Sequence, residues 1–285
     1  MSSRLTPPLV SCEWLAERLA ARDIAILDAT FVLPNQGRQA EQEYLVEHIP
    51  GAKFFDVDTV ADMSDPLPHM LPTPEFFAAS VGRLGIDNTT HVVVYDNNDF
   101  MASARLWWTF RVFGHDRVSV LDGGLKRWLA LGRGFESGLA TLVTSRRFEA
   151  YFRAELVRNL DEVRSLLAQS ESQIADARSP GRFMGSEPEP RPGLRSGHIP
   201  GSKNVFFKTL IDESSGLMKS SPAIDGVFRN AGLDLQRPIV TTCGTGVTAA
   251  VLALGLFRLG REDVPVYDGS WAEWGGREDT PIELG

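Results

Sequence analysis

The chain has 285 residues, 43% of them hydrophobic and 23% charged, which is the composition of an ordinary soluble protein and enough length for two domains. Its formal net charge of −8 argues against a general binder of nucleic acid or membrane surfaces, and no stretch approaches the roughly 20 apolar residues that span a bilayer. Two cysteines, Cys12 and Cys243, exclude a disulfide framework, and the first residues lack the apolar core of a signal peptide, so we expect a cytosolic protein.

Helices and short apolar strands alternate along the first part of the chain. In chain order we expect a helix over 12–23, a strand over 24–28, a helix over 72–85, a strand over 91–96, a helix over 103–114 and a strand over 118–122. Thr73 is the expected N-cap of the second of these helices, with Pro74 in its first turn. The segment from 138 to 158 fits neither pattern, and because it holds little Gly or Pro we expect an ordered connector.

The remaining residues predict the same alternation again. We expect helices over 160–170, 221–232 and 246–260, and strands over 173–177, 238–243 and 264–268. Short buried strands that alternate with helices are typical of a parallel sheet covered on both faces. The sequence therefore predicts an α/β fold in each part.

The two parts resemble each other, which indicates a tandem duplication. "EHIPGAKFF" matches "GHIPGSKNVFF", and "LDGGLKRW" matches "YDGSWAEW". The offset drifts only slowly, between 146 and 150 residues, in the pairs Asp28 and Asp176, His48 and His198, Asp96 and Cys243, Asp122 and Asp268. We therefore expect a first domain over 1–137, a connector over 138–158 and a second domain over 159–285.

Cys243 is the candidate nucleophile. It follows the expected strand over 238–243, and in parallel α/β sheets ligands bind beyond the carboxyl ends of the strands. The backbone N–H groups of Gly244, Thr245, Gly246, Val247 and Thr248 can form an anion-binding nest at the start of the next helix. Such a nest favours a thiolate, which is the nucleophilic form of cysteine.

Two other interpretations of the cysteines were weighed. Free cysteine is often a small buried hydrophobe, and Cys12 is assigned to packing because its expected helix has no such loop. In a Cys-x5-Arg phosphatase, an arginine six positions after the cysteine binds phosphate. Ala249 occupies that position here, which argues against a phosphatase.

Both "HIPG" segments, "CGTGVTA" and "YDGSW" give the chain a resemblance to the tandem-rhodanese sulfurtransferases over nearly its whole length. The resemblance implies two rhodanese-like domains, of which the second carries the active cysteine and the first is non-catalytic. Asp96, which cannot form a persulfide, occupies the matching position in the first domain. The loop after Cys243 resembles the "CGSGVTA" of the 3-mercaptopyruvate branch more than the "CRKGVTA" of the thiosulfate branch.

The resemblance also implies the site residues. Arg182 and Arg191 match arginines that bind substrate, and their planar guanidinium groups suit a carboxylate; Arg178 is a weaker candidate. Thr245 and His48 match a hydroxyl and a histidine thought to act together. His198 holds the same place as His48 in its own repeat, so a structural turn is the alternative for both, and His69 receives no role. Gln39 stands where comparable proteins often have Asp.

The activity implied is transfer of sulfur from 3-mercaptopyruvate, through a Cys243 persulfide, to an acceptor thiol or cyanide, with release of pyruvate. The acceptor is a small thiol or a thioredoxin-like protein. We expect no cofactor, no metal, no nucleic acid or membrane partner, and a monomer. Two alternatives stay open: a thiosulfate sulfurtransferase, and a persulfide carrier or interaction module with little small-molecule turnover.

Overall fold

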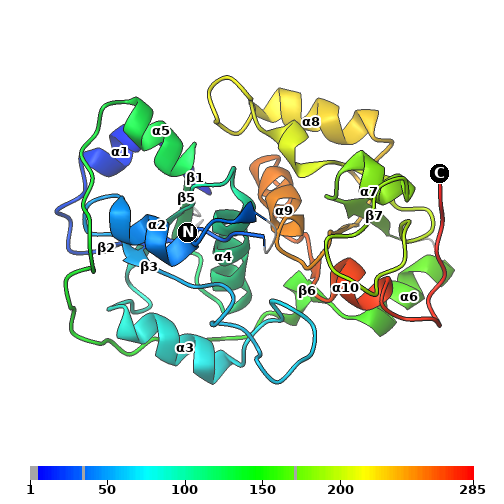
Figure 1. Cartoon of the computed structure of the whole chain (residues 1–285), viewed down its shortest axis with the longest axis horizontal. Coiled ribbons are helices and arrows are strands. Elements are labelled where there is room, and N and C mark those ends of the chain that lie inside the picture. Colours follow the sequence, from blue (N-terminus) through cyan, green and yellow to red (C-terminus); the bar gives the residue numbers. More distant parts are fainter. Residues whose placement is uncertain (1–5, 34–35, 170–171) are drawn as a thin grey trace. The chain divides into compact units, whose positions relative to one another are not determined.

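The computed structural model describes residues 6–33, 36–169 and 172–285, which form two compact units (Figure 1). Each unit contains one sheet of five strands with helices on both faces. All strand pairs in both sheets are parallel. The predicted fold class is therefore confirmed.

Unit 1 has the strand order β1-β5-β4-β2-β3, so β4 is central. Its elements in chain order are β1 (Leu9–Val10), α1 (Cys12–Ala16), β2 (Ile24–Asp28), α2 (Ala40–Val46), β3 (Lys53–Phe54), α3 (Pro74–Arg83), β4 (His91–Tyr95), α4 (Met101–Val112), β5 (Val118–Leu121) and α5 (Gly124–Ala130).

Unit 2 repeats this topology with the order β6-β10-β9-β7-β8, so β9 is central. Its strands are β6 (Val157–Arg158), β7 (Gln173–Asp176), β8 (Lys203–Asn204), β9 (Ile239–Thr242) and β10 (Val266–Tyr267). Its α-helices are α6 (Leu160–Gln169), α7 (Pro180–Met184), α8 (Ser221–Asn230), α9 (Ala249–Arg258) and α10 (Ser270–Trp274), with short 3-10 helices at Ala154–Leu156 and Phe207–Leu210. The identical order of the strands supports the tandem duplication.

Hydrophobic side chains bury both faces of each sheet. In unit 1, α1, α2 and α5 share one core cluster with inward-facing residues of β2 and β4. On the other face α3 packs on α4, where Phe77 stacks on Phe113 with ring centroids 4.5 Å apart. In unit 2, α6 and α10 share a cluster with β7, β9 and β10, and α8 packs on α9. This burial keeps the loop edges of the sheets in fixed positions.

The expected elements are present, with bounds that agree to within about two residues except in two helices. Thr73 caps α3 as predicted, since its side chain accepts a hydrogen bond from the N–H of Phe76. The first helix ends at Ala16 rather than Asp23, because the following residues form tighter turns such as Arg18 N–H to the carbonyl of Leu15. Helix α9 begins at Ala249 rather than at residue 246, and the predicted end of α6 at Ser170 lies outside the described residues.

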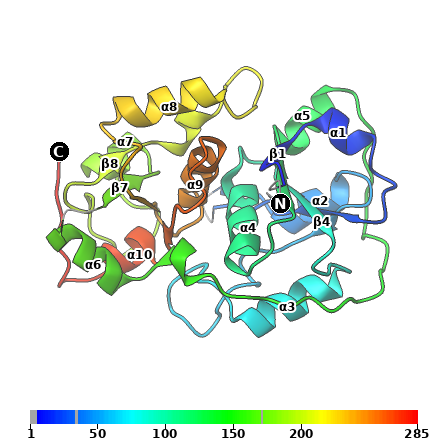
Figure 2. The ribbon, with the colours of Figure 1, turned by 180° about the vertical axis from the view of Figure 1, so that it is seen from behind.

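The residues after α5, up to Arg153, belong to unit 1 and form backbone hydrogen bonds with it. The N–H of Arg146 donates to the carbonyl of Gly82 in α3 at 2.9 Å, and the N–H of Tyr151 donates to Phe113 at 3.0 Å. Figure 2 shows this segment passing along α3. The last residues of the connector form β6, which pairs with β10 in the sheet of unit 2.

The two units exchange short segments. Unit 1 comprises Met1–Asp62, Leu71–Arg153 and Asp212–Met218, and unit 2 comprises Met63–Met70, Ala154–Ile211 and Lys219–Gly285. The exchanged segments occupy matching places in the repeat, between the third strand and the next long helix. One is fixed in unit 1 by the N–H of Met218, which donates to Asp122 at 2.8 Å. The site of each unit thus includes residues from the other repeat.

Within the described ranges, no helix has both the length and the apolar character required to cross a bilayer.

Candidate active site

Cys243 lies at the carboxyl edge of the second sheet, directly after the central strand β9. It is buried, and α10 fixes its backbone. The N–H of Cys243 donates to the Ser270 hydroxyl at 3.2 Å, and its carbonyl accepts from the N–H of Trp271 at 3.0 Å. The thiol is therefore held where ligands bind in parallel α/β sheets.

Ser270 has a left-handed backbone, with φ of +50°, which is uncommon for a residue other than glycine. Its hydroxyl donates to the carbonyl of Tyr267 at 2.7 Å and accepts the N–H of Cys243. The matching residue of the first repeat is Gly124, with φ of +57°. Sequence analysis missed Ser270; the signal was a serine in "YDGSW" where the first repeat has glycine.

The loop Gly244–Thr248, here called the amide cup, connects β9 to α9. In the described part of the chain, the N–H groups of Gly244, Thr245, Val247 and Thr248 have no acceptor among the protein groups. Gly246 turns the loop with φ of +75°, which glycine adopts without strain. Such exposed donors at the start of a helix attract an anion.

The first repeat shows what this loop binds, because there it carries its own anion. Asp96 matches Cys243, and Asp99, with φ of +64°, matches Gly246. The carboxylate of Asp96 accepts four hydrogen bonds of 2.8 to 3.2 Å from the backbone N–H groups of Asn98, Phe100, Ala102 and Ser103. The corresponding N–H groups of the second repeat are those of Thr245, Val247, Ala249 and Ala250, and the N–H groups of Thr245 and Val247 remain available to an anion in the described part of the chain.

Burial raises the pKa of the Asp96 carboxyl, and the hydrogen bonds from the backbone oppose that rise. A carboxylate remains in this buried place because the backbone supplies the donors that water would otherwise supply. The comparison of the two loops indicates that the amide cup can replace the hydration of a buried anion.

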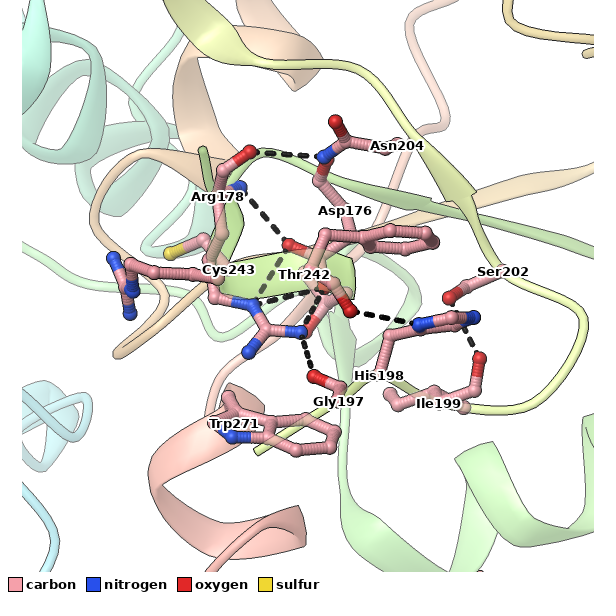
Figure 3. Close-up of polar contacts among 12 residues, drawn as sticks. Asp176, Arg178, Gly197, His198, Ile199, Ser202, Asn204, Thr242, Cys243 and Trp271 are labelled. Atoms are coloured by element: carbon pink, nitrogen blue, oxygen red, sulfur yellow. Dashed lines mark hydrogen bonds and ion pairs between the residues drawn. The ribbon is translucent and has the colours of Figure 1, made fainter. Parts of the chain in front are cut away.

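Arg178 is a structural residue. Its side chain is 0% exposed and pairs with Asp176 at 2.7 Å and with Glu189 at 2.8 Å. It also donates to the carbonyl of Gly197 at 2.8 Å and lies 4.2 Å from the ring centroid of Trp271 (Figure 3). All its nitrogens are therefore engaged in the core, which leaves the other two arginines as candidates for substrate binding.

Arg182 lies against the amide cup. It is the third of the five residues of α7, whose N-cap Ser179 accepts a hydrogen bond from the N–H of Arg182. A Cβ placed on Gly244 would lie 2.9 Å from Nη2 of Arg182, so glycine leaves the space that the guanidinium occupies. The other contact of this guanidinium is Glu189, at 2.5 Å. Arg182 thus places a cation next to the residue that follows Cys243.

Arg191 contacts a histidine from the exchanged segment. Its Nη2 lies 3.2 Å from Nε2 of His69, which belongs to the same unit although it comes from the first repeat. His69 is buried and has a left-handed backbone, with φ of +63°. The structure thus brings His69, for which the sequence gave no role, to a predicted substrate-binding arginine. No helix or strand periodicity in "PLPHMLP" predicts this position.

His48 has a structural environment that His198 repeats. Nδ1 of His48 lies 2.7 Å from the carbonyl of Tyr44, and Nδ1 of His198 lies 2.8 Å from that of Phe183. Each histidine also forms an isolated bridge with a later glutamate, Glu136 or Glu283. In the described part of the chain, His48 contacts residues of unit 1 only, so the structure favours the turn-forming alternative for both "HIPG" segments. Gln39, the N-cap residue of α2, is also in unit 1.

The described side chains include no group of three His, Cys, Asp or Glu residues arranged to hold a metal ion. The chemistry available is a buried thiol, a cup of backbone N–H groups and two guanidinium groups. A thiol in this setting can attack a sulfur atom and hold the added sulfur as an anion.

Comparisons with known proteins agree with this geometry. The model of the rhodanese-like domain matches residues 11–131 and 159–277. The human protein named 3-mercaptopyruvate sulfurtransferase is 44% identical over 96% of this chain and 93% of its own length. An Arabidopsis thaliana protein named "Thiosulfate/3-mercaptopyruvate sulfurtransferase 1, mitochondrial" is 47% identical over 97% of this chain and 78% of its own length.

A solved structure shows the same fold. The crystal structure of SseA from Escherichia coli, described as a 3-mercaptopyruvate sulfotransferase with the "Rhodanese" fold, superposes with a TM-score of 0.85 at 40% identity. The match covers 93% of this chain and 99% of that one.

Proposed function

The chain belongs to the rhodanese family, and on that premise we propose that it is a sulfurtransferase that moves sulfur from 3-mercaptopyruvate to a thiol acceptor through a persulfide on Cys243. The observation that carries the proposal is the pair of matching loops. In the first repeat the loop holds a carboxylate on four N–H groups, and in the second repeat the matching loop follows a thiol. The first repeat has no thiol at this place and is the non-catalytic one.

The first half-reaction transfers one sulfur atom. The thiolate of Cys243 attacks the thiol sulfur of 3-mercaptopyruvate, an S–S bond forms, and the C–S bond breaks. The electron pair of that C–S bond leaves as the enolate of pyruvate, and the proton of the donor thiol ends on its methyl carbon. The persulfide that remains is anionic, and the amide cup stabilises it. Thr245 passes the proton, with His48 as the predicted partner; His69, which lies in unit 2 and contacts Arg191, is the alternative partner.

Arg182 and Arg191 bind the carboxylate of the donor in this proposal. We expect Arg182→Ala to raise KM for 3-mercaptopyruvate roughly 10- to 100-fold with little change in kcat, the range for one lost charge-assisted hydrogen bond. Steady-state kinetics with varied donor measure this. Arg182→Lys keeps the positive charge but loses the planar guanidinium group, so its KM should lie between those of the wild type and Arg182→Ala. An unchanged KM in Arg182→Ala would exclude carboxylate binding there.

Thiosulfate is the second candidate donor, because one relative carries both donors in its name. Gly244 and Thr245 favour 3-mercaptopyruvate, since the cup itself carries no cation for a dianion. We expect Gly244→Arg with Thr245→Lys to raise the ratio of kcat/KM for thiosulfate over 3-mercaptopyruvate at least about tenfold, because a side chain at 244 also displaces Arg182. Thr245→Ser is the matched control and should keep the original preference. A fall in the ratio would contradict this explanation of specificity.

The acceptor completes the cycle by taking the outer sulfur of the persulfide. We propose a small thiol or a thioredoxin-like protein, and a monomeric enzyme of the cytosol, as the composition suggests. A screen of donors, read by intact mass for a 32 Da adduct that then disappears with each thiol, identifies both partners. Loading by a protein donor alone, without turnover of 3-mercaptopyruvate, would identify a persulfide carrier instead.

A further inference from the structure

We infer that Glu189 is a positioning residue that fixes Arg182 beside the amide cup. Arg182 then orients the carboxylate of 3-mercaptopyruvate, and Arg191 supplies the net positive charge that attracts it. The inference rests on the proposed function, because it assigns a task within the same site. It concerns a glutamate that lies in "EPEPR" and that does not itself touch the reacting atoms.

Glu189 joins the buried core to the site. One carboxylate oxygen lies 2.8 Å from Nη1 of Arg178, and the other lies 2.5 Å from Nη2 and 3.2 Å from Nε of Arg182. The side chain of Glu189 is only 2% exposed, compared with 22% for Arg182. The partly exposed arginine is therefore held by a buried acid rather than by solvent.

Arg178 makes this acid rigid. Its guanidinium is fixed by Asp176, by the carbonyl of Gly197 and by the face of Trp271. Figure 3 shows the contacts of Arg178 with Asp176, the last residue of β7, and with Gly197. The contact of Arg178 with Glu189 connects them to the loop that carries this acid. Because these contacts already order the long side chain of Arg182, it loses less conformational freedom when a substrate binds.

The contact with Glu189 also determines which edge of Arg182 is available. Nε and Nη2 share one carboxylate oxygen, and Nη2 lies next to Gly244. In the described part of the chain, Nη1 of Arg182 has no protein acceptor. The guanidinium therefore offers a donor beside the cup, in an orientation that Glu189 sets.

The charges of the two arginines differ. Asp176 and Glu189 balance Arg178 and Arg182 in one buried group with no net charge. Arg191 contacts the ring of His69, and the described residues include no acidic partner for it. The uncompensated cation of the site is therefore Arg191. The attraction of the anionic 3-mercaptopyruvate depends mainly on Arg191, whereas the alignment of its carboxylate depends on Arg182.

The test compares Glu189→Gln with Glu187→Gln. An amide can accept from one arginine only and turns an N–H₂ group toward the other, so Arg182 loses its orientation. We expect kcat/KM for 3-mercaptopyruvate to fall about tenfold through KM, with kcat within about twofold of wild type. Glu187 is exposed and contacts the Ser179 hydroxyl at 3.1 Å, so Glu187→Gln should leave both constants unchanged.

A double-mutant cycle separates positioning from general stability. In the Arg182→Ala background, Glu189→Gln should cause no further rise in KM, because its effect passes through Arg182. An equal rise in both backgrounds, or a wild-type KM in the single variant, would overturn the inference. If Glu189→Gln does not fold, as judged by circular dichroism, Glu189→Asp keeps the charge but cannot reach both arginines. A folded Glu189→Asp with wild-type KM would overturn the inference as well.

A failure of this inference can be distinguished from a failure of the proposed function. If wild-type protein forms no 32 Da adduct with 3-mercaptopyruvate, the donor assignment fails, whatever the variants do. If the wild type forms the adduct and Glu189→Gln forms it with unchanged dependence on donor concentration, only the role of Glu189 fails.

Discussion

Cys243→Ser is expected to lower kcat/KM for 3-mercaptopyruvate by about 10,000-fold or more, because a hydroxyl cannot form the S–S bond of a persulfide. The fold should not change, since serine is similar in size and the backbone contacts to Ser270 and Trp271 do not involve the sulfur. Turnover of the donor and the intact mass after incubation measure the effect, and the variant should show no 32 Da adduct.

Cys12→Ser is the matched control. Cys12 is buried, and burial raises the pKa of its thiol to about 11, so it stays protonated and unreactive at neutral pH. This variant should retain wild-type turnover and the full adduct. Retained activity in Cys243→Ser would exclude Cys243 as the nucleophile, and an adduct lost only in Cys12→Ser would move the sulfur to the other cysteine.

Asp96→Ala is expected to lower the free energy of unfolding of unit 1 by about 3 kcal/mol, although Asp96 has no part in the chemistry. The four N–H groups that bind its carboxylate would be left in a buried place without an acceptor. The energy recovered by no longer burying a charge offsets part of this loss. Urea unfolding measures the change, and hydrogen exchange should accelerate at the amides of Asn98, Phe100, Ala102 and Ser103.

Asp99→Asn provides the comparison in the same loop. Asp99 pairs with Lys126 at 3.0 Å on the surface, and asparagine tolerates its left-handed backbone, so we expect a change below about 1 kcal/mol. If Asp96→Ala unfolds at the same urea concentration as Asp99→Asn, the carboxylate does not organise the loop. The analogy with an anion on Cys243 would then lose its support.

The sequence predicted the elements where periodicity and repetition were strong. Buried strands such as β4 and β9 are continuous apolar runs, and the matching "HIPG" and "DG" segments aligned the two repeats before any coordinates. The position of Cys243 after such a strand was enough to place it at the edge of the sheet. The first helix was predicted to be too long, because an alanine-rich stretch favours helix locally. In the structure the residues after α1 form turns instead.

The roles of single polar residues depended on contacts that no local pattern contains. Arg178 and Arg182 have the same side chain and lie close together in the sequence, yet Arg178 pairs with Asp176 in the core and Arg182 lies at the amide cup. His48 carried a visible motif, while His69 reaches Arg191 only because its segment belongs to the other unit. Glu189 differs from Glu187 only through its two guanidinium partners.

The exchange of segments between the units bears on why the first repeat persists, although Asp96 stands where the second repeat has Cys243. Met63–Met70 is encoded in the first repeat but folds with the second, where His69 meets Arg191. Deleting the first repeat would therefore also remove a segment of unit 2. Because each repeat supplies a segment of the other unit, mutations could remove the chemistry of one repeat while selection still retained that repeat in the gene.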